Sequence, residues 1–310
     1  MGDAFIFPGQ GSQAVGMGKN LAEAFPAARE VFAEVDDALG QHLTRIMFEG
    51  PDEELTLTEN AQPALMAVSM AVVRVLEKEG GRVLSRSARF VAGHSLGEYS
   101  ALAAAGVFGL ADTARLLRTR GRAMQEAAPV GEGAMAAILG LDLDAVLAIA
   151  RAAAEADVCA AANDNAPGQV VVSGHRRAVE RAIAIASTRG ARRAILLPVS
   201  APFHCALMAP AAEVMAEALA AIPVAAPAVP VVSNVRAEAV TAPAEILELL
   251  VTQVTGMVRW RESVLWMRDR GIERVVEIGP GKVLSGLARR IDPDLQSISL
   301  ATVEDIDTFL

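Results

Sequence analysis

The chain has 310 residues, 53% of them hydrophobic and 21% charged, which is enough to bury the core of one large domain or two smaller ones. Its formal net charge of −9 argues against a general nucleic-acid binder and against an anionic-membrane binder, because both need a cationic surface. Cys159 and Cys205 are its two cysteines, which give neither a disulfide framework nor a zinc motif and fit a reducing, cytoplasmic setting.

The first predicted element is a strand, DAFIFP (3–8), which runs into a glycine-rich turn. Three later stretches are similarly short, β-branched and apolar on both faces: ARFVAGHS (88–95), VPVVSNV (229–235) and IERVVEIG (272–279). This composition is typical of parallel strands that helices cover on both sides. Helical patterns lie between the strands, at 59–80, 110–127, 205–221, 243–254 and 260–270. The sequence therefore predicts an α/β domain with a mostly parallel sheet.

The most apolar helical stretch, PALMAVSMAVVRVL (63–76), contains Arg74 and is shorter than the roughly 20 residues that span a bilayer. We expect a buried helix there and no association with membranes. The N-terminal MGDAFIFPGQ lacks the basic and then apolar pattern of a signal peptide, so we expect a cytoplasmic location.

The stretch 131–199 has a different pattern. GAMAAILG, DVCAAAN, GQVVVSG and ARRAILLPV are strand-like, and helical patterns follow the first and the third of them. The order β-α-β-β-α-β is that of the ferredoxin-like unit. We therefore expect a small ferredoxin-like domain (129–199) inserted into a large α/β domain formed by residues 1–128 and 200–310.

The sequence GHSLG (93–97) places Ser95 between a predicted strand and a predicted helix. A G-x-S-x-G motif in this context is a nucleophile elbow, as in α/β-hydrolase-like domains, whereas an isolated match is only a turn. The glycines permit the strained turn, and the backbone N–H of Leu96 would face a developing oxyanion. We therefore expect Ser95 to be a nucleophile.

The glycine-rich turn GQGSQA (9–14) fits a dinucleotide-binding fingerprint, but no acidic residue follows a second strand at the distance that this fingerprint requires. Two interpretations remain open. The turn is structural, or its backbone N–H groups face an oxyanion.

A nucleophilic serine needs a base, and the chain has four histidines. We expect His42 to be exposed, His94 to pack beside the elbow or support it, and His175 to cap the start of a helix in the small domain. His204 follows the small domain, where the chain returns to the large one, in a loop that Pro202 stiffens. We therefore expect His204 to be the base for Ser95.

A hydrolase triad in the order Ser, acid, His requires a carboxylate at the end of a strand of the large domain. Several carboxylates fall between Ser95 and His204, and they lie in predicted helices or in the insert: Glu98, Asp112, Asp142, Asp144, Asp157, Asp164 and Glu180. A Ser-His pair that a neutral group orients is therefore favoured over a triad.

The helix LLRTRGRAMQEA contains Arg115, Arg118, Arg120 and Arg122. We expect three of them to form a solvated basic face. One inward-facing arginine could pair bidentately with a substrate carboxylate, and Arg120 is the candidate.

Together these motifs resemble the malonyl-CoA:acyl carrier protein transacylases of fatty acid synthesis, which are related to polyketide acyltransferase domains. The matching stretches cover nearly the whole chain: FPGQGSQ (7–13), GHSLGEYSALAAAG (93–106), RG (120–121), NAPGQVVVSG (165–174), PFHCALM (202–208) and EIGPGKVLSGL (277–287). The resemblance implies transfer of malonyl from coenzyme A to the phosphopantetheine thiol of an acidic acyl carrier protein, with no tightly bound cofactor and no metal.

The resemblance also implies roles for individual residues. Ser95 would carry the malonyl group and His204 would be its base. The backbone N–H groups of Gln10 and Leu96 would form the oxyanion hole. The main-chain carbonyl of Gln253 would orient the histidine, which accounts for the missing acid.

Other residues would recognise the substrates. Arg120 would hold the malonyl carboxylate, and Phe203 would fill the space that a 2-methyl branch needs. Asn165 either lines the cleft or only makes the turn in NDNAPG. A basic patch would dock the carrier on an otherwise acidic chain, and its candidates are Arg192, Arg193, Lys282 and Arg290.

Three alternatives remain. A serine thioesterase would share the elbow but has little use for Arg120. A carrier-binding module without catalysis would be expected to lack Ser95 or His204. An acyltransferase of a polyketide pathway would use the same chemistry on another carrier. We expect a monomer.

Overall fold

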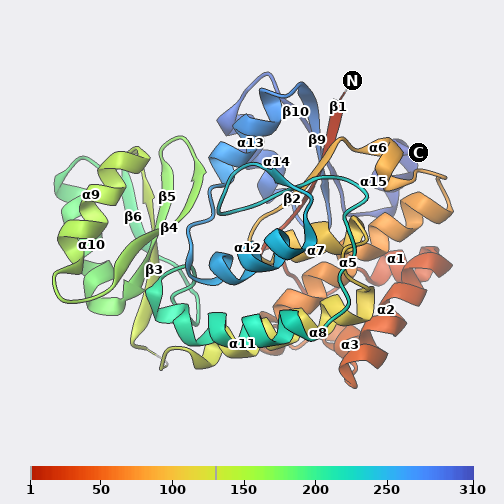
Figure 1. Cartoon of the computed structure of the whole chain (residues 1–310), viewed down its shortest axis with the longest axis horizontal. Helices are drawn as coiled ribbons and strands as arrows, with labels where there is room; N and C mark the ends of the chain where they lie inside the picture. The colour runs from red at the N-terminus through yellow and green to blue at the C-terminus, as the bar shows by residue number, and fades with distance from the viewer. Residues whose placement is uncertain (1, 130) are drawn as a thin grey trace.

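The computed structural model describes residues 2–129 and 131–310. Within these residues the strands form two sheets, one of six strands and one of four. Figure 1 shows the four-stranded sheet with its two helices at the left of the view, beside the larger sheet and the helices that surround it.

The larger sheet has the strand order β10-β9-β1-β2-β7-β8, and its pairs are parallel except for β7 with β8. Its strands are β1 (Gly2–Phe7), β2 (Phe90–Gly93), β7 (Val231–Val232), β8 (Ala239–Val240), β9 (Ile272–Ile278) and β10 (Gln296–Leu300). The parallel pairing confirms the sheet type that the apolar strands predict.

Helices cover both faces of this sheet. Phe5 and Phe7 of β1 belong to one buried core with residues of α2 (Pro26–Leu39) and α5 (Thr58–Lys78). Ala4 and Ile6 belong to a second core with residues of α13 (Trp260–Arg268) and α14 (Val283–Ile291). Alternate residues of a strand point to opposite faces, so both sets are buried. The helices of this part of the fold are α1 (Lys19–Ala24), α2 (Pro26–Leu39), α3 (Leu43–Glu49), α4 (Asp52–Thr56), α5 (Thr58–Lys78), α6 (Leu84–Ser87), α7 (Leu96–Ala104), α8 (Leu110–Glu126), η1 (Ala206–Met208), α11 (Ala209–Ala220), α12 (Pro243–Thr255), α13 (Trp260–Arg268), α14 (Val283–Ile291) and α15 (Val303–Phe309).

The smaller sheet is antiparallel, with the strand order β4-β5-β3-β6. Its elements follow the predicted β-α-β-β-α-β order: β3 (Gly133–Leu139), α9 (Leu143–Ala154), β4 (Cys159–Ala166), β5 (Gln169–His175), α10 (Arg176–Thr188) and β6 (Arg193–Leu196). One face of this sheet packs on α9 and α10 through residues such as Ile138 and Val172. The domain boundaries at 128/129 and 199/200 stay a prediction.

Standard end signals account for several helix boundaries. Pro26 occupies the first turn of α2, and Gly40 ends the helix with a φ of 57°. The side chain of Asp142 accepts a hydrogen bond from the backbone N–H of Ala145 at the start of α9. Thr302 and Asp305 form a capping box at the start of α15.

Two parts of the sequence prediction need correction. The edge strands β8 and β10 were not expected. Strand β8 has only two residues, and β10 (QSISL) alternates polar and apolar residues, whereas the predicted strands are apolar on both faces. Strand β4 continues to Ala166, so the turn is confined to Pro167 and Gly168. The NDN segment is therefore strand rather than turn.

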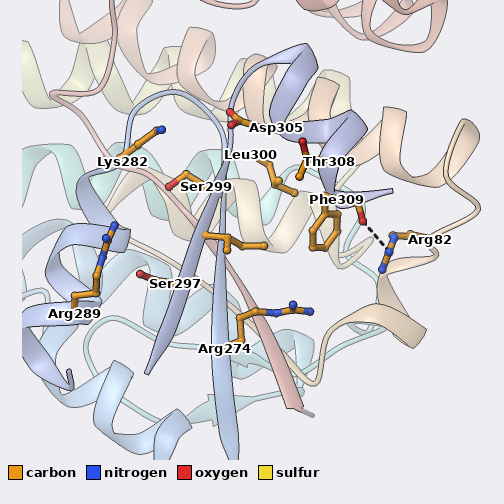
Figure 2. Close-up of a pocket in the computed structure, with 11 residues that line it drawn as sticks. Arg82, Arg274, Lys282, Arg289, Ser297, Ser299, Leu300, Asp305, Thr308 and Phe309 are labelled. Atoms are coloured by element: carbon orange, nitrogen blue, oxygen red, sulfur yellow. Dashed lines mark hydrogen bonds between the residues drawn. The ribbon is translucent and has the colours of Figure 1, made fainter. Parts of the chain in front are cut away.

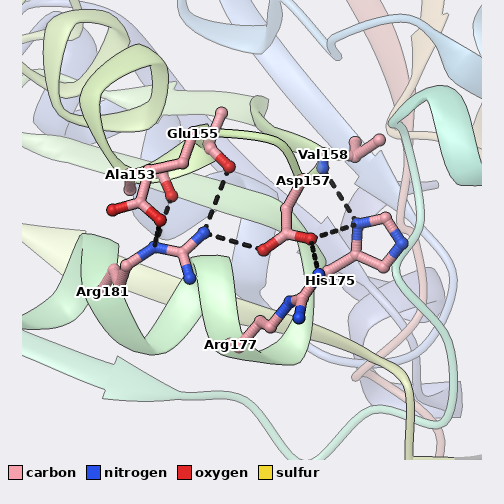
Figure 3. Close-up of polar contacts among 8 residues, drawn as sticks. Ala153, Glu155, Asp157, Val158, His175, Arg177 and Arg181 are labelled. Atoms are coloured by element: carbon pink, nitrogen blue, oxygen red, sulfur yellow. Dashed lines mark hydrogen bonds and ion pairs between the residues drawn. The ribbon is translucent and has the colours of Figure 1, made fainter.

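A polar cluster ties α10 to the end of α9 (Figure 3). Arg181 donates to Asp157 at 2.8 Å, and hydrogen bonds from Arg177 and Arg181 lower the pKa of Asp157 to about 2. His175 immediately precedes α10, as expected, but its ring does not cap the helix. Instead its Nδ1 atom accepts a hydrogen bond from the backbone N–H of Val158 at 2.9 Å.

Within residues 2–129 and 131–310, every helix is too short or too polar to span a membrane.

Candidate active site

Ser95 lies on a sharp turn between β2 and α7, with a φ of 54° and a ψ of −110°. The flanking glycines have no room for a side chain. A Cβ atom on Gly93 would lie 1.9 Å from the carbonyl carbon of Gly97, and one on Gly97 would lie 2.2 Å from the carbonyl oxygen of Phe7. Glycine at these positions lets the strand, the turn and the helix approach closely, which exposes the serine hydroxyl.

His204 faces Ser95 from the loop that precedes η1. Its Nε2 atom lies 2.8 Å from Oγ of Ser95, and its Nδ1 atom lies 2.9 Å from the carbonyl oxygen of Gln253 and 3.1 Å from that of Gly256. Carbonyl oxygens only accept, so Nδ1 carries the proton and Nε2 presents its lone pair to the serine hydroxyl. The geometry is that of a nucleophile and a base whose orienting group is the peptide backbone.

Two effects keep His204 neutral. Its side chain is buried, and burial together with the positive charge of Arg120 lowers the pKa of His204 to about 3. A neutral imidazole at pH 7 is the form that can accept the serine proton.

Arg120 of α8 is a buried cation next to this pair, with 1% of its surface exposed. Its Nη1 atom donates to Oε1 of Gln62 at 2.8 Å, and its Nη2 atom donates to Oε1 of Gln253 at 2.9 Å and to Oγ of Ser95 at 3.1 Å. All three partners are uncharged. A buried guanidinium with neutral partners is a strong site for a ligand carboxylate, because the ligand supplies the missing negative charge.

Only part of the predicted solvated face of α8 is solvated. Arg115 and Arg122 have more than half of their side chains exposed and pair with Asp112 and Glu59. Arg118 is 8% exposed, however, and donates to the backbone carbonyl of Glu59 and to the side chain of Gln41. The expectation for Arg118 was wrong, because its guanidinium hydrogen-bonds to the backbone of α5, and the packing of α8 against α5 buries it.

Ser95, His204 and Arg120 open into a cavity of about 500 Å³ between the two sheets. Met135 and Val171 of the smaller sheet line it, so the face of that sheet opposite α9 and α10 forms one wall. Phe203 contributes to the apolar lining and is 9% exposed. The cavity therefore joins an apolar wall to a polar, cationic end, which suits an acyl chain that ends in a charge.

The predicted oxyanion-hole residues also line this cavity. Leu96 is the first residue of α7, a position at which a helix supplies no internal acceptor for the backbone N–H. Gln10 follows β1, and the preceding Gly9 lies so close to the elbow that a Cβ atom there would be 2.7 Å from the carbonyl oxygen of His94. The backbone N–H of Ser95 itself donates to Oδ1 of Asn234 at 2.7 Å.

Asn165 lines the cavity from β4, and its Oδ1 atom lies 2.8 Å from Nε2 of His94. His94 is half-buried, with its ring centroid 5.7 Å from that of Trp260, and desolvation lowers its pKa. Of the two possibilities for Asn165, the structure supports the cleft position rather than the turn.

The sequence interpretation did not identify Gln62, Asn234 or Glu98 as part of this site. Gln62 and Asn234 contact Arg120 and Ser95 directly, and Glu98 accepts hydrogen bonds from Gln253 and from the backbone of Asn234. Asn234 carried a usable signal, because it follows β7 at the carboxyl edge of a parallel sheet, where ligands bind. In the described residues no three His, Cys, Asp or Glu side chains gather as metal ligands would.

The predicted carrier-docking residues lie in two places. Arg193 on β6 is opposite Leu139 of β3, which is opposite Gln169 of β5, and Arg290 of α14 donates to Gln169. Arg192 and Arg193 therefore lie on the same side of the molecule as Arg290, and all three are exposed.

Lys282 lies elsewhere, at the rim of a separate cleft of about 560 Å³. Figure 2 shows it with Arg289 and Arg274 around this cleft, which β10 and α15 border. Arg274 is neutralised by Asp3, whereas Lys282 and Arg289 are exposed.

Comparisons with known proteins agree with this architecture. The sequence pattern of the acyl transferase domain family matches residues 4–301. A relative from Escherichia coli (strain K12), named malonyl CoA-acyl carrier protein transacylase, is 49% identical over 297 residues, which cover 96% of this chain and 95% of that protein. A relative of the same name from Bacillus subtilis (strain 168) is 47% identical over 305 residues, covering 98% of this chain and 95% of that one.

Solved structures agree as well. The crystal structure of an acyl-carrier-protein-S-malonyltransferase from Bartonella henselae superposes with a TM-score of 0.98 at 58% identity, covering 100% of this chain and 98% of that one. A malonyl-transacylase solved in complex with a type II PKS acyl-carrier protein has a TM-score of 0.96 at 43% identity, covering 99% and 98%. The chain therefore belongs to the acyl transferase domain family and, within it, to the malonyl CoA-acyl carrier protein transacylases.

Proposed function

We propose that this protein transfers a malonyl group from coenzyme A to the phosphopantetheine thiol of an acyl carrier protein, through a malonyl ester of Ser95. The observation that carries the proposal is the buried guanidinium of Arg120, held by neutral partners 3.1 Å from the hydroxyl of Ser95. Acyl groups without a carboxylate would leave this cation unpaired. The family resemblance implies that the product supplies fatty acid synthesis.

In the first half-reaction, Oγ of Ser95 attacks the thioester carbonyl and Nε2 of His204 takes the hydroxyl proton. The backbone N–H groups of Leu96 and Gln10 donate to the oxyanion. Collapse of the tetrahedral intermediate breaks the C–S bond, and the departing coenzyme A thiolate takes the proton from His204. The carbonyl of Gln253 accepts from Nδ1 throughout and keeps the ring oriented.

The second half-reaction reverses these roles. Nε2 of His204 removes the proton of the phosphopantetheine thiol, and the thiolate attacks the malonyl ester. The C–O bond of the ester breaks, and Ser95 regains its proton from His204. The enzyme therefore alternates between two forms in a ping-pong cycle, and coenzyme A is a substrate rather than a bound cofactor.

Carrier recognition is a separate part of the proposal. Arg192, Arg193 and Arg290 are exposed cations on one side of an acidic protein, and they suit an acidic carrier. Lys282 belongs to a second basic area with Arg289. The complex of a 43% identical relative with a carrier protein supports a surface of this kind.

The test is intact-protein mass spectrometry after brief mixing with malonyl-CoA, with acetyl-CoA as the paired donor. We expect a malonyl adduct that is absent in Ser95→Ala, weak in Arg120→Gln, weak with acetyl-CoA and transferred to added holo-carrier. An adduct that disappears in water equally fast without the carrier would identify a hydrolase. An equally strong malonyl adduct in Arg120→Gln would contradict the role of Arg120.

A further inference from the structure

Glu98 lies three residues after Ser95 and carries a buried carboxyl group that the proposed cycle does not use. It lies in the first turn of α7 and is 3% exposed. Its Oε2 atom accepts a hydrogen bond from Nε2 of Gln253 at 2.8 Å and one from the backbone N–H of Asn234 at 3.1 Å. A buried carboxylate is costly and is retained only where hydrogen bonds or charges compensate it, so these contacts need an explanation.

The side chain of Gln253 connects Glu98 to the substrate end of the cavity. Its Nε2 atom donates to Glu98 and also to the carbonyl oxygen of Ser95, at 3.0 Å. Its Oε1 atom accepts from Nη2 of Arg120 at 2.9 Å. The backbone of the same residue orients His204, so Gln253 serves two different parts of the site.

A carboxamide can face its neighbours in two ways, and the partners decide which one is stable. A carboxylate and a carbonyl oxygen only accept, so they require the NH2 group of Gln253 on the side of Glu98. Its oxygen must then face Arg120. The flipped amide would set its oxygen against two acceptors, the Glu98 carboxylate and the Ser95 carbonyl, and its NH2 group against the guanidinium, which is repulsive at both ends.

The amide oxygen in turn fixes the guanidinium. Arg120 donates through Nη1 to Gln62 on one side and through Nη2 to Gln253 on the other. Two acceptors at different nitrogens hold the plane of the fork, and a fork in a fixed plane can receive a carboxylate bidentately. If one acceptor is lost, the guanidinium can turn away from Ser95.

We propose that Glu98 is a positioning residue for acyl selectivity: its carboxylate sets the Gln253 amide so that Arg120 is held in the direction that receives the acyl carboxylate. The proposal rests on the proposed role of Arg120. It assigns Glu98 no contact with the substrate and no proton transfer. Arg120 is the charged group that faces Glu98 from α8, while Gln253 of α12 and Asn234 after β7 face it with neutral groups.

The experiment compares acylation by malonyl-CoA and by acetyl-CoA, because only the malonyl group carries the carboxylate. We expect Glu98→Met to lower the malonyl-to-acetyl ratio of kcat/KM by about tenfold or more, which corresponds to the loss of an oriented hydrogen bond to a charged group. Glu98→Gln is the matched control, since the N–H of Asn234 holds an amide oxygen in the same place. It should stay within about threefold of the original ratio.

A second variant approaches the same link from the other side. Gln253→Met removes the amide but keeps the main-chain carbonyl that orients His204. It should lower the ratio as Glu98→Met does, and the double variant should lower it no further, because both changes break one connection.

Three results would overturn the proposal: an unchanged ratio in Glu98→Met (including an equal fall for both acyl donors), a fall in Glu98→Gln as large as in Glu98→Met, or additive effects in the double variant. Arg120→Gln distinguishes this proposal from the one on which it rests. If Arg120→Gln leaves the ratio unchanged, the carboxylate role of Arg120 is wrong and this inference fails with it. If Arg120→Gln lowers the ratio and Glu98→Met does not, only this inference fails.

Discussion

The Nε2 atom of His204 lies 2.8 Å from the hydroxyl oxygen of Ser95, and both residues have a positive φ, 59° and 54°. Backbones in this region cost free energy for residues other than glycine, so the surrounding structure must hold them there. The Oδ1 atom of Asn234 accepts a hydrogen bond from the backbone N–H of Ser95, and the carbonyls of Gln253 and Gly256 accept from the ring of His204. The pair is therefore positioned before any substrate binds.

The first prediction concerns the pH dependence of acylation. Burial and Arg120 lower the pKa of His204 to about 3, so the base stays neutral far below the usual histidine range near pH 6.5. We expect kcat/KM for acylation to show no loss of activity near pH 6.5 that depends on His204. If the malonyl carboxylate pairs with Arg120 as proposed, it neutralises that charge and removes one cause of the lowered pKa, so the acid limb of kcat with malonyl-CoA should lie at higher pH.

Single-turnover measurements with both donors test this prediction. The acetyl group leaves Arg120 unpaired and provides the control, because its acid limb should not move between kcat/KM and kcat. A common limb near pH 6.5 for both donors would show that His204 titrates as an ordinary histidine.

The second prediction concerns stability. Burial raises the pKa of Glu98 to about 7, above the value of 4.5 expected in the unfolded chain. The folded state therefore binds more protons between these values, and stability is lost as the pH rises through this window. Glu98→Gln removes the titration, so its free energy of unfolding relative to the original protein should improve between pH 5 and 8 by on the order of 2 kcal/mol.

Urea unfolding of the original protein and of Glu98→Gln at about pH 5 and about pH 8 measures this difference in the free energy of unfolding. The Ser95→Ala protein is a suitable control, because it changes the same turn without removing a titrating group. A pH-independent difference for Glu98→Gln would mean that Glu98 keeps an ordinary pKa.

The third prediction concerns the width of the acyl pocket. Phe203 lines the cavity beside His204, and we expect a 2-methyl branch of the acyl group to meet its ring. We expect Phe203→Ser to raise the methylmalonyl-to-malonyl ratio of kcat/KM by about tenfold, since fitting one methyl group contributes roughly 1–3 kcal/mol. Competition between the two coenzyme A thioesters gives the ratio directly. An unchanged ratio would place the methyl group elsewhere in the cavity.

The fourth prediction separates carrier binding from chemistry. Reversal of Arg192, Arg193 and Arg290 to Glu should raise the apparent KM for the carrier by at least about tenfold at low salt, and the difference should shrink as salt screens the charges. Acylation by malonyl-CoA should be unchanged. The matched control reverses Arg29, Arg45 and Arg86, which are exposed on α2, α3 and α6, away from β6 and α14. A parallel fall in both half-reactions, or the same carrier effect in the control, would contradict the patch.

Much of the site was accessible from local sequence. The G-x-S-x-G motif between a strand and a helix identified Ser95, and the apolar strands predicted the parallel sheet. Strand β10 was missed because its alternating pattern is that of a sheet edge. Glu98 lies in a helix, as predicted, but its contacts with Asn234 and Gln253 were not predicted, and Arg118 was wrongly expected to be solvated. The partners of Glu98 and Arg118 come from distant parts of the chain.

The sequence by itself determined the turn at Ser95, the parallel strands β1, β2, β7 and β9, and the order of the elements in the smaller sheet. These features are encoded by neighbouring residues, because turn geometry and hydrophobic periodicity act over short distances. Only the tertiary structure decided the partners of Arg120. Gln62 is 58 positions from Arg120 and Gln253 is 133 positions from it, and the same Gln253 is 155 positions from Glu98. Hydrogen bonds of this kind depend on how α5, α7, α8 and α12 pack, and no local pattern reports which of their buried polar side chains will meet.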